Sequence, residues 1–282
     1  MENKIIILGG DSRMDYLYMY LAGDGLNVCR LLGNKNTEKN NTEDKFDISH
    51  ISGADIIILG MPASYDGINV SAPFADIKVS LADIADSFGG RTIFGGVLPK
   101  SFCERAELNG INCTDYSKTE SLMVYNAIST AEGAILTAMQ NTPFTVCGSK
   151  CLVTGYGRIG KILAQMLKGL GAEVTVSARK DSDFAHILSN GLKCADSQNI
   201  KTALTDKNII FNTVPHNLIN NEYYRLINKD ALIIDLASKP GYINKELCSK
   251  YGIKTVHALA LPGKTAPQSA GYAIYKTVKK VI

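Results

Sequence analysis

The chain has 282 residues, of which 45% are hydrophobic and 20% are charged, and its formal net charge is +3. This length predicts one large globular domain or two ordinary ones. The small charge, with Lys and Arg spread along the chain, excludes a strongly basic nucleic-acid-binding protein. The N-terminal apolar run is short and no stretch approaches the ~20 apolar residues of a membrane helix, so neither a signal peptide nor a membrane protein is expected.

The cysteines and histidines give no sign of a disulfide framework or a metal site. The seven cysteines are odd in number and contain no Cys-x-x-Cys pair. The four histidines show no metal-ligand spacing. We therefore expect buried free thiols, no metal and a reducing, cytoplasmic compartment.

The first half of the chain predicts alternating strands and helices. Apolar runs predict strands at 4–10, 26–32, 54–62, 91–97 and 111–117. Helical spacing predicts helices at 12–25, 79–90 and 99–110. The polar stretch 33–45 predicts an exposed loop, and the long loop 63–78 predicts a lid or substrate loop in which Ser64 and Ser71 are candidate carboxylate ligands. A disordered connector is the alternative for that second loop.

The second half repeats this alternation after a long predicted helix at 118–140. Strands are predicted at 150–155, 173–178, 207–215, 231–238 and 253–261, and a closing helix at 265–282. Alternating apolar strands and amphipathic helices predict an α/β fold of two Rossmann-like, doubly wound parallel-sheet domains with a cleft between them. The predicted domains are 1–142 with the C-terminal helix 265–282, which would bind substrate, and 143–264, which would bind a nucleotide.

A glycine turn carries the strongest functional signal. Gly155, Gly157 and Gly160 form Gly-x-Gly-x-x-Gly between a predicted strand and a predicted helix, the context that dinucleotide binding requires. Such a turn places a pyrophosphate on the positive N-terminus of the helix. The intervening residues Tyr156, Arg158 and Ile159 are expected to join this site.

The end of the next strand favours NADP over NAD. It reads Ser177, Ala178, Arg179 and Lys180, where many NAD enzymes have an acidic residue. An arginine with a nearby serine suits a ribose 2′-phosphate. Asp181 and Asp183 follow slightly late for a ribose ligand, so NAD use stays open. Five residues at later strand ends should flank the nicotinamide side, namely Thr213, Val214, Pro215, Ala237 and Ser238.

Several longer motifs resemble one family. They are Ile-Leu-Gly-Gly-Asp-Ser-Arg (7–13), the helix segment that begins Tyr-Asn-Ala-Ile-Ser-Thr-Ala-Glu-Gly (125–133), the glycine turn, Ile-Ile-Asp-Leu-Ala-Ser-Lys-Pro-Gly (233–241) and a Leu-Pro-Gly segment that continues to Ala-Gly (261–271). Together they resemble the A subunits of bacterial dipicolinate synthases, over nearly the whole chain.

This resemblance implies an NAD(P)-dependent oxidoreductase that forms dipicolinate from a dihydrodipicolinate or 4-hydroxy-tetrahydrodipicolinate precursor. It also implies a cytosolic protein in the mother cell of a sporulating bacterium, working with a flavoprotein-like B subunit. Homo-oligomers of the chain itself are compatible with this. The substrate would be a small dicarboxylate, which calls for cationic or amide ligands.

Six candidate catalytic residues follow from the resemblance and from position. Ser12 and Arg13 would clamp a carboxylate after the first strand, Lys239 would lie near the nicotinamide, and Asn126, Thr130 and Glu132 lie within two turns of one helix. Glu132 would suit acid–base chemistry if burial raised its pKa. His216 and Lys264 are weaker candidates, and solvated surface residues are the alternative for Arg13 and Lys239.

One departure separates the chain from the 2-hydroxyacid dehydrogenases, a wider group with the same two-domain layout. They place a catalytic His in a Thr-Pro-His segment after the last strand, whereas residues 261–267 contain no His and His257 precedes them. Simple hydroxyacid oxidation is therefore disfavoured. Two alternatives remain open: a generic NADP-linked 2-oxo or 2-hydroxy acid reductase, and a non-catalytic nucleotide-binding subunit of a heteromer.

Overall fold

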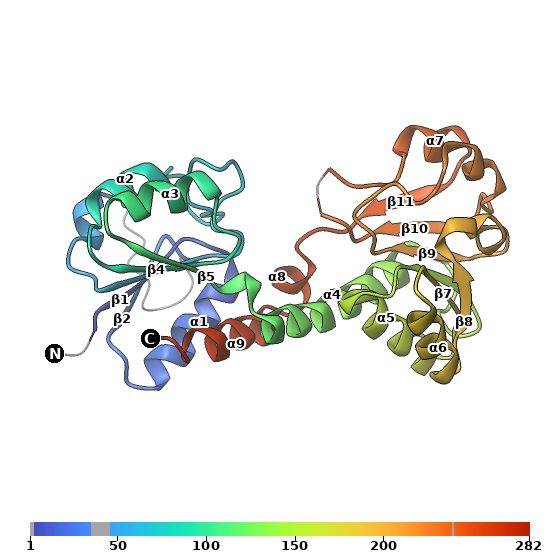
Figure 1. Cartoon of the computed structure of the whole chain (residues 1–282), viewed down its shortest axis with the longest axis horizontal. Coiled ribbons are helices and arrows are strands. Elements are labelled where there is room, and N and C mark those ends of the chain that lie inside the picture. Colours follow the sequence, from blue (N-terminus) through green and yellow to red (C-terminus); the bar gives the residue numbers. More distant parts are fainter. Residues whose placement is uncertain (1–2, 35–45, 239) are drawn as a thin grey trace. The chain divides into compact units, whose positions relative to one another are not determined.

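The computed structural model of the chain describes residues 3–34, 46–238 and 240–282. The chain divides into two compact units, Met1–Asn126 with Ala266–Ile282, and Ala127–Thr265. Each unit is a parallel β-sheet with helices on both faces (Figure 1), which confirms the predicted Rossmann-like α/β class. The cleft expected between the domains stays a prediction.

The first unit contains a five-stranded sheet in the order β2-β1-β3-β4-β5. Its strands are β1 (Ile5–Leu8), β2 (Val28–Leu31), β3 (Ile56–Leu59), β4 (Thr92–Gly95) and β5 (Asn112–Asp115), and all neighbours run parallel. The order reverses at β1, where β2 lies on one side and β3 on the other. In open sheets of this kind ligands bind beyond the carboxyl ends of the strands at such a reversal.

Helices cover both faces of this sheet because successive side chains of a strand point to opposite sides. The helices are α1 (Ser12–Gly23), α2 (Leu81–Ser87), α3 (Lys100–Leu108), the start of α4 (Glu120–Asn141) and α9 (Pro267–Val278). Ile6 and Leu8 pack with α2 and α3, whereas Ile5 and Ile7 pack with α1 and α9. Buried strands with apolar residues on both sides are what a doubly covered parallel sheet requires.

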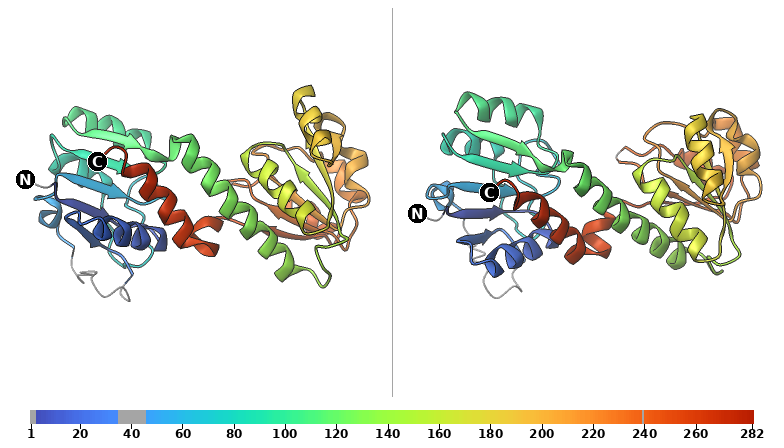
Figure 2. Two further views of the ribbon diagram at one scale, coloured as in Figure 1. Left: turned by 90° about the horizontal axis from the view of Figure 1, so that it is seen from below. Right: turned by 60° about the horizontal axis from the view of Figure 1, so that its bottom comes forward.

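The C-terminal helix belongs to the first unit. In both views of Figure 2, α9 lies beside α1. Ala273, Ile274 and Val278 are buried in the core that α1 and the sheet share. Gly271 permits the close approach, because a Cβ at this position would lie 2.5 Å from the carbonyl oxygen of Arg13.

The second unit contains a six-stranded parallel sheet in the order β11-β10-β9-β6-β7-β8. Its strands are β6 (Lys150–Thr154), β7 (Glu173–Ala178), β8 (Lys193–Asp196), β9 (Ile209–Asn212), β10 (Leu232–Asp235) and β11 (Lys254–His257). Its helical segments include α5 (Arg158–Gly169), α6 (Asp181–Ser189), η3 (Ser197–Leu204), η4 (Asn221–Leu226), α7 (Lys245–Lys250) and α8 (Leu261–Thr265). The order reverses between β6 and β9.

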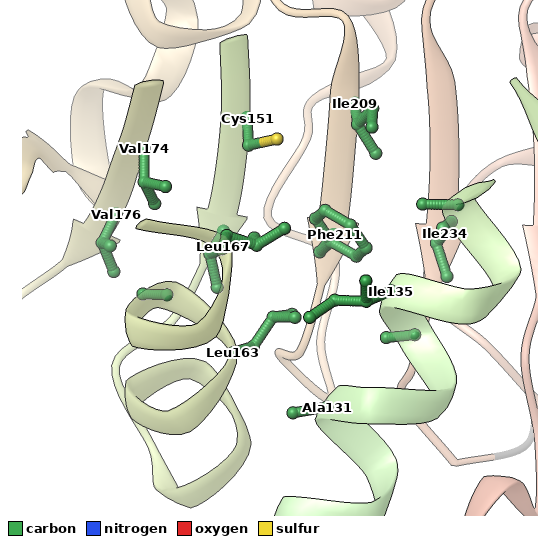
Figure 3. Packing of buried hydrophobic residues seen from close by; sticks show 14 of the residues in the cluster. Ala131, Ile135, Cys151, Leu163, Leu167, Val174, Val176, Ile209, Phe211 and Ile234 are labelled. Carbon is green, nitrogen blue, oxygen red and sulfur yellow. The ribbon is translucent and has the colours of Figure 1, made fainter. Parts of the chain in front are cut away.

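The second half of α4 packs in the core of the second unit. Ala131 and Ile135 of α4 meet Leu163 of α5 and Phe211 of β9 (Figure 3). This packing places the division of the chain after Asn126, inside α4, whereas the sequence predicted it at the end of that helix, after residue 142. The predicted boundary followed the break in helical spacing, but burial assigns the later turns of α4 to the sheet of the second unit.

Two predictions of local structure need comment. The polar strand β8 had no counterpart among the predicted elements. The closing helix predicted at 265–282 corresponds to α9, and the short helix α8 precedes it, beginning at the last residue of the strand predicted at 253–261. The loop predicted at 33–45 lies, from residue 35 on, outside the described residues. Within the described ranges, every helix is too short or too polar to cross a membrane.

Candidate functional site

The glycine turn that follows β6 has the geometry of a dinucleotide-binding loop. Gly155 has φ +87°, and a Cβ there would lie 2.7 Å from Val214 Cγ2. A Cβ at Gly160 would clash with the backbone carbonyl of Gly155, so this glycine lets α5 pack against the turn. A Cβ at Gly157 would meet no atom within 4 Å, and Gly157 is the N-cap of α5 without a side-chain cap. Both the open approach at Gly157 and the uncapped helix N-terminus suit a pyrophosphate.

A cavity of about 540 Å³ opens beside this turn, at the carboxyl ends of β6, β7 and β9. Nine of the predicted cofactor residues line it: Gly155, Tyr156, Gly157, Ala178, Arg179, Lys180, Thr213, Val214 and Pro215. The residues come from strand ends on both sides of the sheet reversal, as the rule for open α/β sheets predicts. The residues present therefore fit a dinucleotide.

The other predicted cofactor residues lie outside the lining of this cavity. Ser177 is fully buried, with its hydroxyl 3.2 Å from the Ser197 hydroxyl, and does not line the cavity, so its role as a 2′-phosphate ligand stays a prediction. Ser177 lies within β7 and faces Ser197, whereas Ala178 ends the strand and Arg179 follows it, and these two residues line the cavity. Ile159 packs against the core, and Arg158 and Gly160 contribute to the first turn of α5. Ala237 and Ser238 do not line the cavity and stay a prediction.

Two charged residues that the sequence did not bring forward as principal ligands also line the cavity. Lys161, in the first turns of α5, lies with its Nζ 5.1 Å from the centroid of the Tyr156 ring. Asp183, in the first turn of α6, lies on the same wall as Arg179 and Lys180. The available signal for Lys161 was its place four residues after Gly157, since residues one helical turn apart face the same side.

A buried hydrogen-bond network holds the loops on either side of the sheet reversal. The Thr154 hydroxyl donates to Asn212 Oδ1 at 2.7 Å, and Asn212 Nδ2 donates to Asp235 Oδ1 at 2.8 Å. Asp235 then accepts the backbone amides of Ala237 at 3.1 Å and Tyr242 at 2.8 Å. These side chains fix the segments that follow β9 and β10. The one signal for them in the sequence is that each is a polar residue at the end of an apolar strand.

In the first unit, the turn after β1 lies at that sheet's own reversal. Gly9 and Gly10 have φ of +65° and +83°, and Gly10 donates its amide to the carbonyl of Ser71. A Cβ at Gly10 would lie 3.0 Å from Gly60 Cα, after β3. The two glycines thus allow the ends of β1 and β3 to approach each other closely.

Arg13 is buried in this turn, which excludes the alternative that it is a solvated surface residue. Its Nε and Nη2 donate to the two carboxylate oxygens of Asp11 at 2.8 Å each, and Nη2 also donates to the Met61 carbonyl. Burial alone would lower the pKa of Arg13, but the hydrogen bond and charge of Asp11 more than offset this and raise it. Arg13 therefore stays charged, with Asp11 as a fixed counter-ion.

Neighbouring groups hold this turn in place. Asn126 Nδ2 lies 3.9 Å from Met61 Sδ, which brings one predicted α4 residue to the end of β3. The Tyr116 hydroxyl donates to the Leu59 carbonyl at 2.8 Å, and burial raises the pKa of Tyr116, so the hydroxyl keeps its proton. Ser12, Arg13 and Asn126 remain predicted substrate ligands.

A second buried arginine, Arg30, contacts the backbone of the turn after β1. Arg30 is fully buried, and its Nε donates to Asp15 Oδ1 at 3.0 Å while its Nη1 donates to the Leu31 carbonyl at 2.9 Å. Burial lowers the pKa of Arg30 and raises that of Asp15, because both charges have left water. Arg30 also reaches the Gly10 carbonyl at 3.4 Å. It therefore fixes the glycine turn from inside the unit.

The remaining candidate residues differ in exposure and position. Glu132 is exposed, which corrects the expectation that burial raises its pKa and suits it to acid–base chemistry. Thr130 is half-buried on α4, one turn after Asn126. Lys239 lies outside the described residues. His216 lines the dinucleotide cavity, and Lys264 is exposed on α8.

The predicted lid or substrate loop is ordered around its own hydrogen bonds. The Ser64 hydroxyl donates to Asp66 at 3.0 Å, and the Ser71 amide donates to the Ala63 carbonyl at 2.8 Å. Ser71 is buried, and its carbonyl accepts the Gly10 amide. The loop therefore packs over the glycine turn rather than forming a disordered connector. Among the described residues, no three His, Cys, Asp or Glu side chains form a group that could hold a metal.

Two family models match the chain, one in each unit. The N-terminal domain of the dipicolinate synthase A subunit matches residues 4–117, and the NAD binding domain of D-isomer specific 2-hydroxyacid dehydrogenases matches residues 125–257. With the glycine turn and the cavity, the second match identifies a nicotinamide dinucleotide as the cofactor of this oxidoreductase subunit.

Named relatives cover the whole chain. The dipicolinate synthase A subunit of Bacillus subtilis (strain 168) is 30% identical over 99% of this chain and 95% of its own length. The crystal structure of the A subunit from Bacillus halodurans has 25% identity and a TM-score of 0.88, covering 99% of this chain and 97% of that one. The crystal structure of the Bacillus subtilis protein has 29% identity and a TM-score of 0.86, covering 100% and 96%. The chain belongs to the family of dipicolinate synthase A subunits.

Proposed function

We propose that the chain is an NADP-dependent oxidoreductase subunit that forms dipicolinate, pyridine-2,6-dicarboxylate, in the cytoplasm of a sporulating cell. The substrate is a dihydrodipicolinate, or a 4-hydroxy-tetrahydrodipicolinate that first loses water. Oxidation to the pyridine removes two electrons and two hydrogens from the ring. One hydrogen leaves with both electrons to the cofactor and the other leaves as a proton, so that NADP⁺ becomes NADPH.

The observation that carries the cofactor proposal is the charge of the cavity wall beside β7. Arg179 and Lys180 line the cavity where an NAD enzyme commonly presents a carboxylate to the ribose. A guanidinium matches a phosphate through paired, charge-assisted hydrogen bonds. Bound there, the cofactor supplies the hydride acceptor, and the protein supplies position and the exclusion of water.

The turn after β1 supports the proposed substrate site. Arg13 and Asn126 both contact Met61, just after the end of β3 at the reversal of the first sheet, and Ser12 precedes Arg13 in the first turn of α1. We propose that Ser12, Arg13 and Asn126 bind and orient one ring carboxylate. The Asp11 counter-ion keeps Arg13 fixed, so that the substrate meets a preformed donor rather than a mobile side chain. A flavoprotein-like B subunit is the proposed partner of the complete enzyme.

Reversal of the charge at position 179 tests the choice of cofactor. Arg179→Glu is expected to weaken NADP binding roughly tenfold or more, because a charge-assisted contact is worth about 1.5–3 kcal/mol. NAD binding should be retained or improved. Calorimetric titration with each nucleotide measures both effects, and Lys201→Glu, an equal change at an exposed residue outside the cavity, is the control. Equal losses for NADP and NAD would exclude a 2′-phosphate contact.

Reconstitution tests the reaction. The chain, NADP⁺ and freshly generated 4-hydroxy-tetrahydrodipicolinate, with and without the B subunit, should yield dipicolinate and NADPH in equal amounts. Glyoxylate and pyruvate with NADPH serve as the comparison, because the second unit matches a 2-hydroxyacid dehydrogenase domain. Turnover of these acids in place of dipicolinate formation would favour the generic reductase. Dipicolinate formation by the isolated B subunit would assign the chemistry to the partner.

A further inference from the structure

Among the described residues that line the dinucleotide cavity, one carboxylate accompanies several cations. Lys161, Arg179 and Lys180 line it, and Asp183 lines it with them. Asp183 lies in the first turn of α6, and its backbone amide donates to the Lys180 carbonyl at 2.9 Å. The backbones of Asp183 and Lys180 are thus held within one helical turn of each other, and both residues line the cavity close to the end of β7. A cavity built only to attract phosphates would not need this carboxylate.

Helix stability alone does not account for the position. Acidic residues in the first turn of a helix interact favourably with its positive N-terminus, and α6 has two, Asp181 and Asp183. The two aspartates differ in position and in burial, since Asp183 lines the cavity and is half-buried, whereas Asp181 does not line it and is exposed. The pair therefore provides a matched comparison between a helix-capping charge and a ligand-facing charge.

We propose that Asp183 sets the balance between NAD and NADP in this cavity. The inference rests on the proposed dinucleotide site and deepens it. A carboxylate accepts hydrogen bonds from a ribose 2′-hydroxyl and repels a 2′-phosphate. Arg179 and Lys180 have the opposite preference. With both kinds of charge on one wall, the cavity admits both cofactors, and Asp183 moderates a preference for NADP that the two cations would otherwise make stronger.

Lys161 has a different part in this arrangement. It belongs to α5, whose N-terminus faces the pyrophosphate position, and the Tyr156 ring holds its ammonium at 5.1 Å from the ring centroid. The pyrophosphate is common to NAD and NADP. Lys161 therefore strengthens the binding of both cofactors and does not discriminate between them.

The test compares binding of two fragments that differ only in the 2′-phosphate, 5′-ADP and 2′,5′-ADP, alongside NAD and NADP. Asp183→Asn keeps the size of the side chain and is expected to weaken 5′-ADP and NAD while strengthening 2′,5′-ADP and NADP. The ratio of the two affinities should shift roughly tenfold or more, the size of one charge-assisted contact. Asp181→Asn removes the same charge from the same helical turn and should leave the ratio within about twofold, because screening weakens an exposed charge beyond the first contact shell.

Each outcome bears on the inference. A shifted ratio in Asp183→Asn, with an unchanged ratio in Asp181→Asn and parallel losses in Lys161→Ala, supports it. Equal shifts in both aspartate variants would mean that the general field of α6 acts, and an unchanged ratio in Asp183→Asn would mean that its carboxylate does not reach the ribose; either overturns it. If Arg179→Glu shifts the ratio and Asp183→Asn does not, the proposed cofactor site stands and this inference alone fails. If neither variant changes any affinity, the cofactor site itself is wrong.

Discussion

Valine in place of Gly157 is expected to weaken dinucleotide binding on the order of a hundredfold, because two or more charge-assisted bonds to the pyrophosphate are lost. The fold should remain intact. Gly157 has φ −80° and ψ −166°, an extended conformation that any residue adopts, and a Cβ there meets no atom within 4 Å. The new side chain would instead occupy the approach of the pyrophosphate to α5.

Gly160→Ala is the matched opposite case. The same kind of change there forces a Cβ against the Gly155 carbonyl, so the free energy of unfolding should fall by about 1–3 kcal/mol or more. Urea unfolding of both variants, together with calorimetric titration of NADP, separates the two effects. A Gly157→Val protein that binds NADP with unchanged affinity would show that the nucleotide lies elsewhere. Loss of stability in that variant, at the level of Gly160→Ala, would contradict the open geometry of the turn.

Removal of residues 267–282, which contain α9, is expected to unfold the first unit. The helix buries Ala273, Ile274 and Val278 against α1 and the sheet. Truncation of one large buried aliphatic side chain costs about 2–5 kcal/mol, so the loss of the whole apolar stripe should exceed the ~5–15 kcal/mol that stabilises an ordinary domain or come close to it. Tyr272, on the same helix, is 45% exposed and contributes less.

Limited proteolysis with mass spectrometry measures this directly. In the truncated chain, new cleavage sites should appear throughout 3–126, while 127–265 stays as resistant as in the intact protein. Two single substitutions refine the result: Ile274→Ala should expose the first unit to cleavage at lower denaturant concentrations, and Tyr272→Ala should have little effect. A truncated protein whose residues 3–126 remain fully resistant would show that α1 and the sheet do not need α9.

Most of the strands could be predicted because a parallel sheet covered on both faces requires continuous apolar runs. Ile5–Leu8 and Ile56–Leu59 have no polar residue and are buried along their whole length. Strand β8, Lys193–Asp196, has no such signal, since its side chains are exposed or half-buried. It forms by pairing with β7, as in Thr175 opposite Lys193, and such long-range pairing leaves no local pattern.

The candidate site also has a part that could be predicted from the sequence and a part that could not. Its glycine turn was predictable because Gly155 has a positive φ and a Cβ at Gly160 would clash with the Gly155 carbonyl, and both constraints act within a few residues of sequence. Which polar side chains near the turn face the cavity was only partly predictable. Ser177 and Arg179 are two residues apart and both carry suitable groups, yet Ser177 is fully buried and Arg179 is exposed.

By itself the sequence determined the alternation of strands and helices, the place of the dinucleotide turn and the cationic end of β7. The tertiary structure alone decided that α4 contributes to two cores, that α9 completes the first unit, and that Asp183 rather than Asp181 faces the cavity. The physical reason is the sequence separation over which each interaction acts. Apolar periodicity and glycine conformations are set by neighbours along the chain, whereas the direction of a polar side chain is set by elements that arrive from distant parts of it.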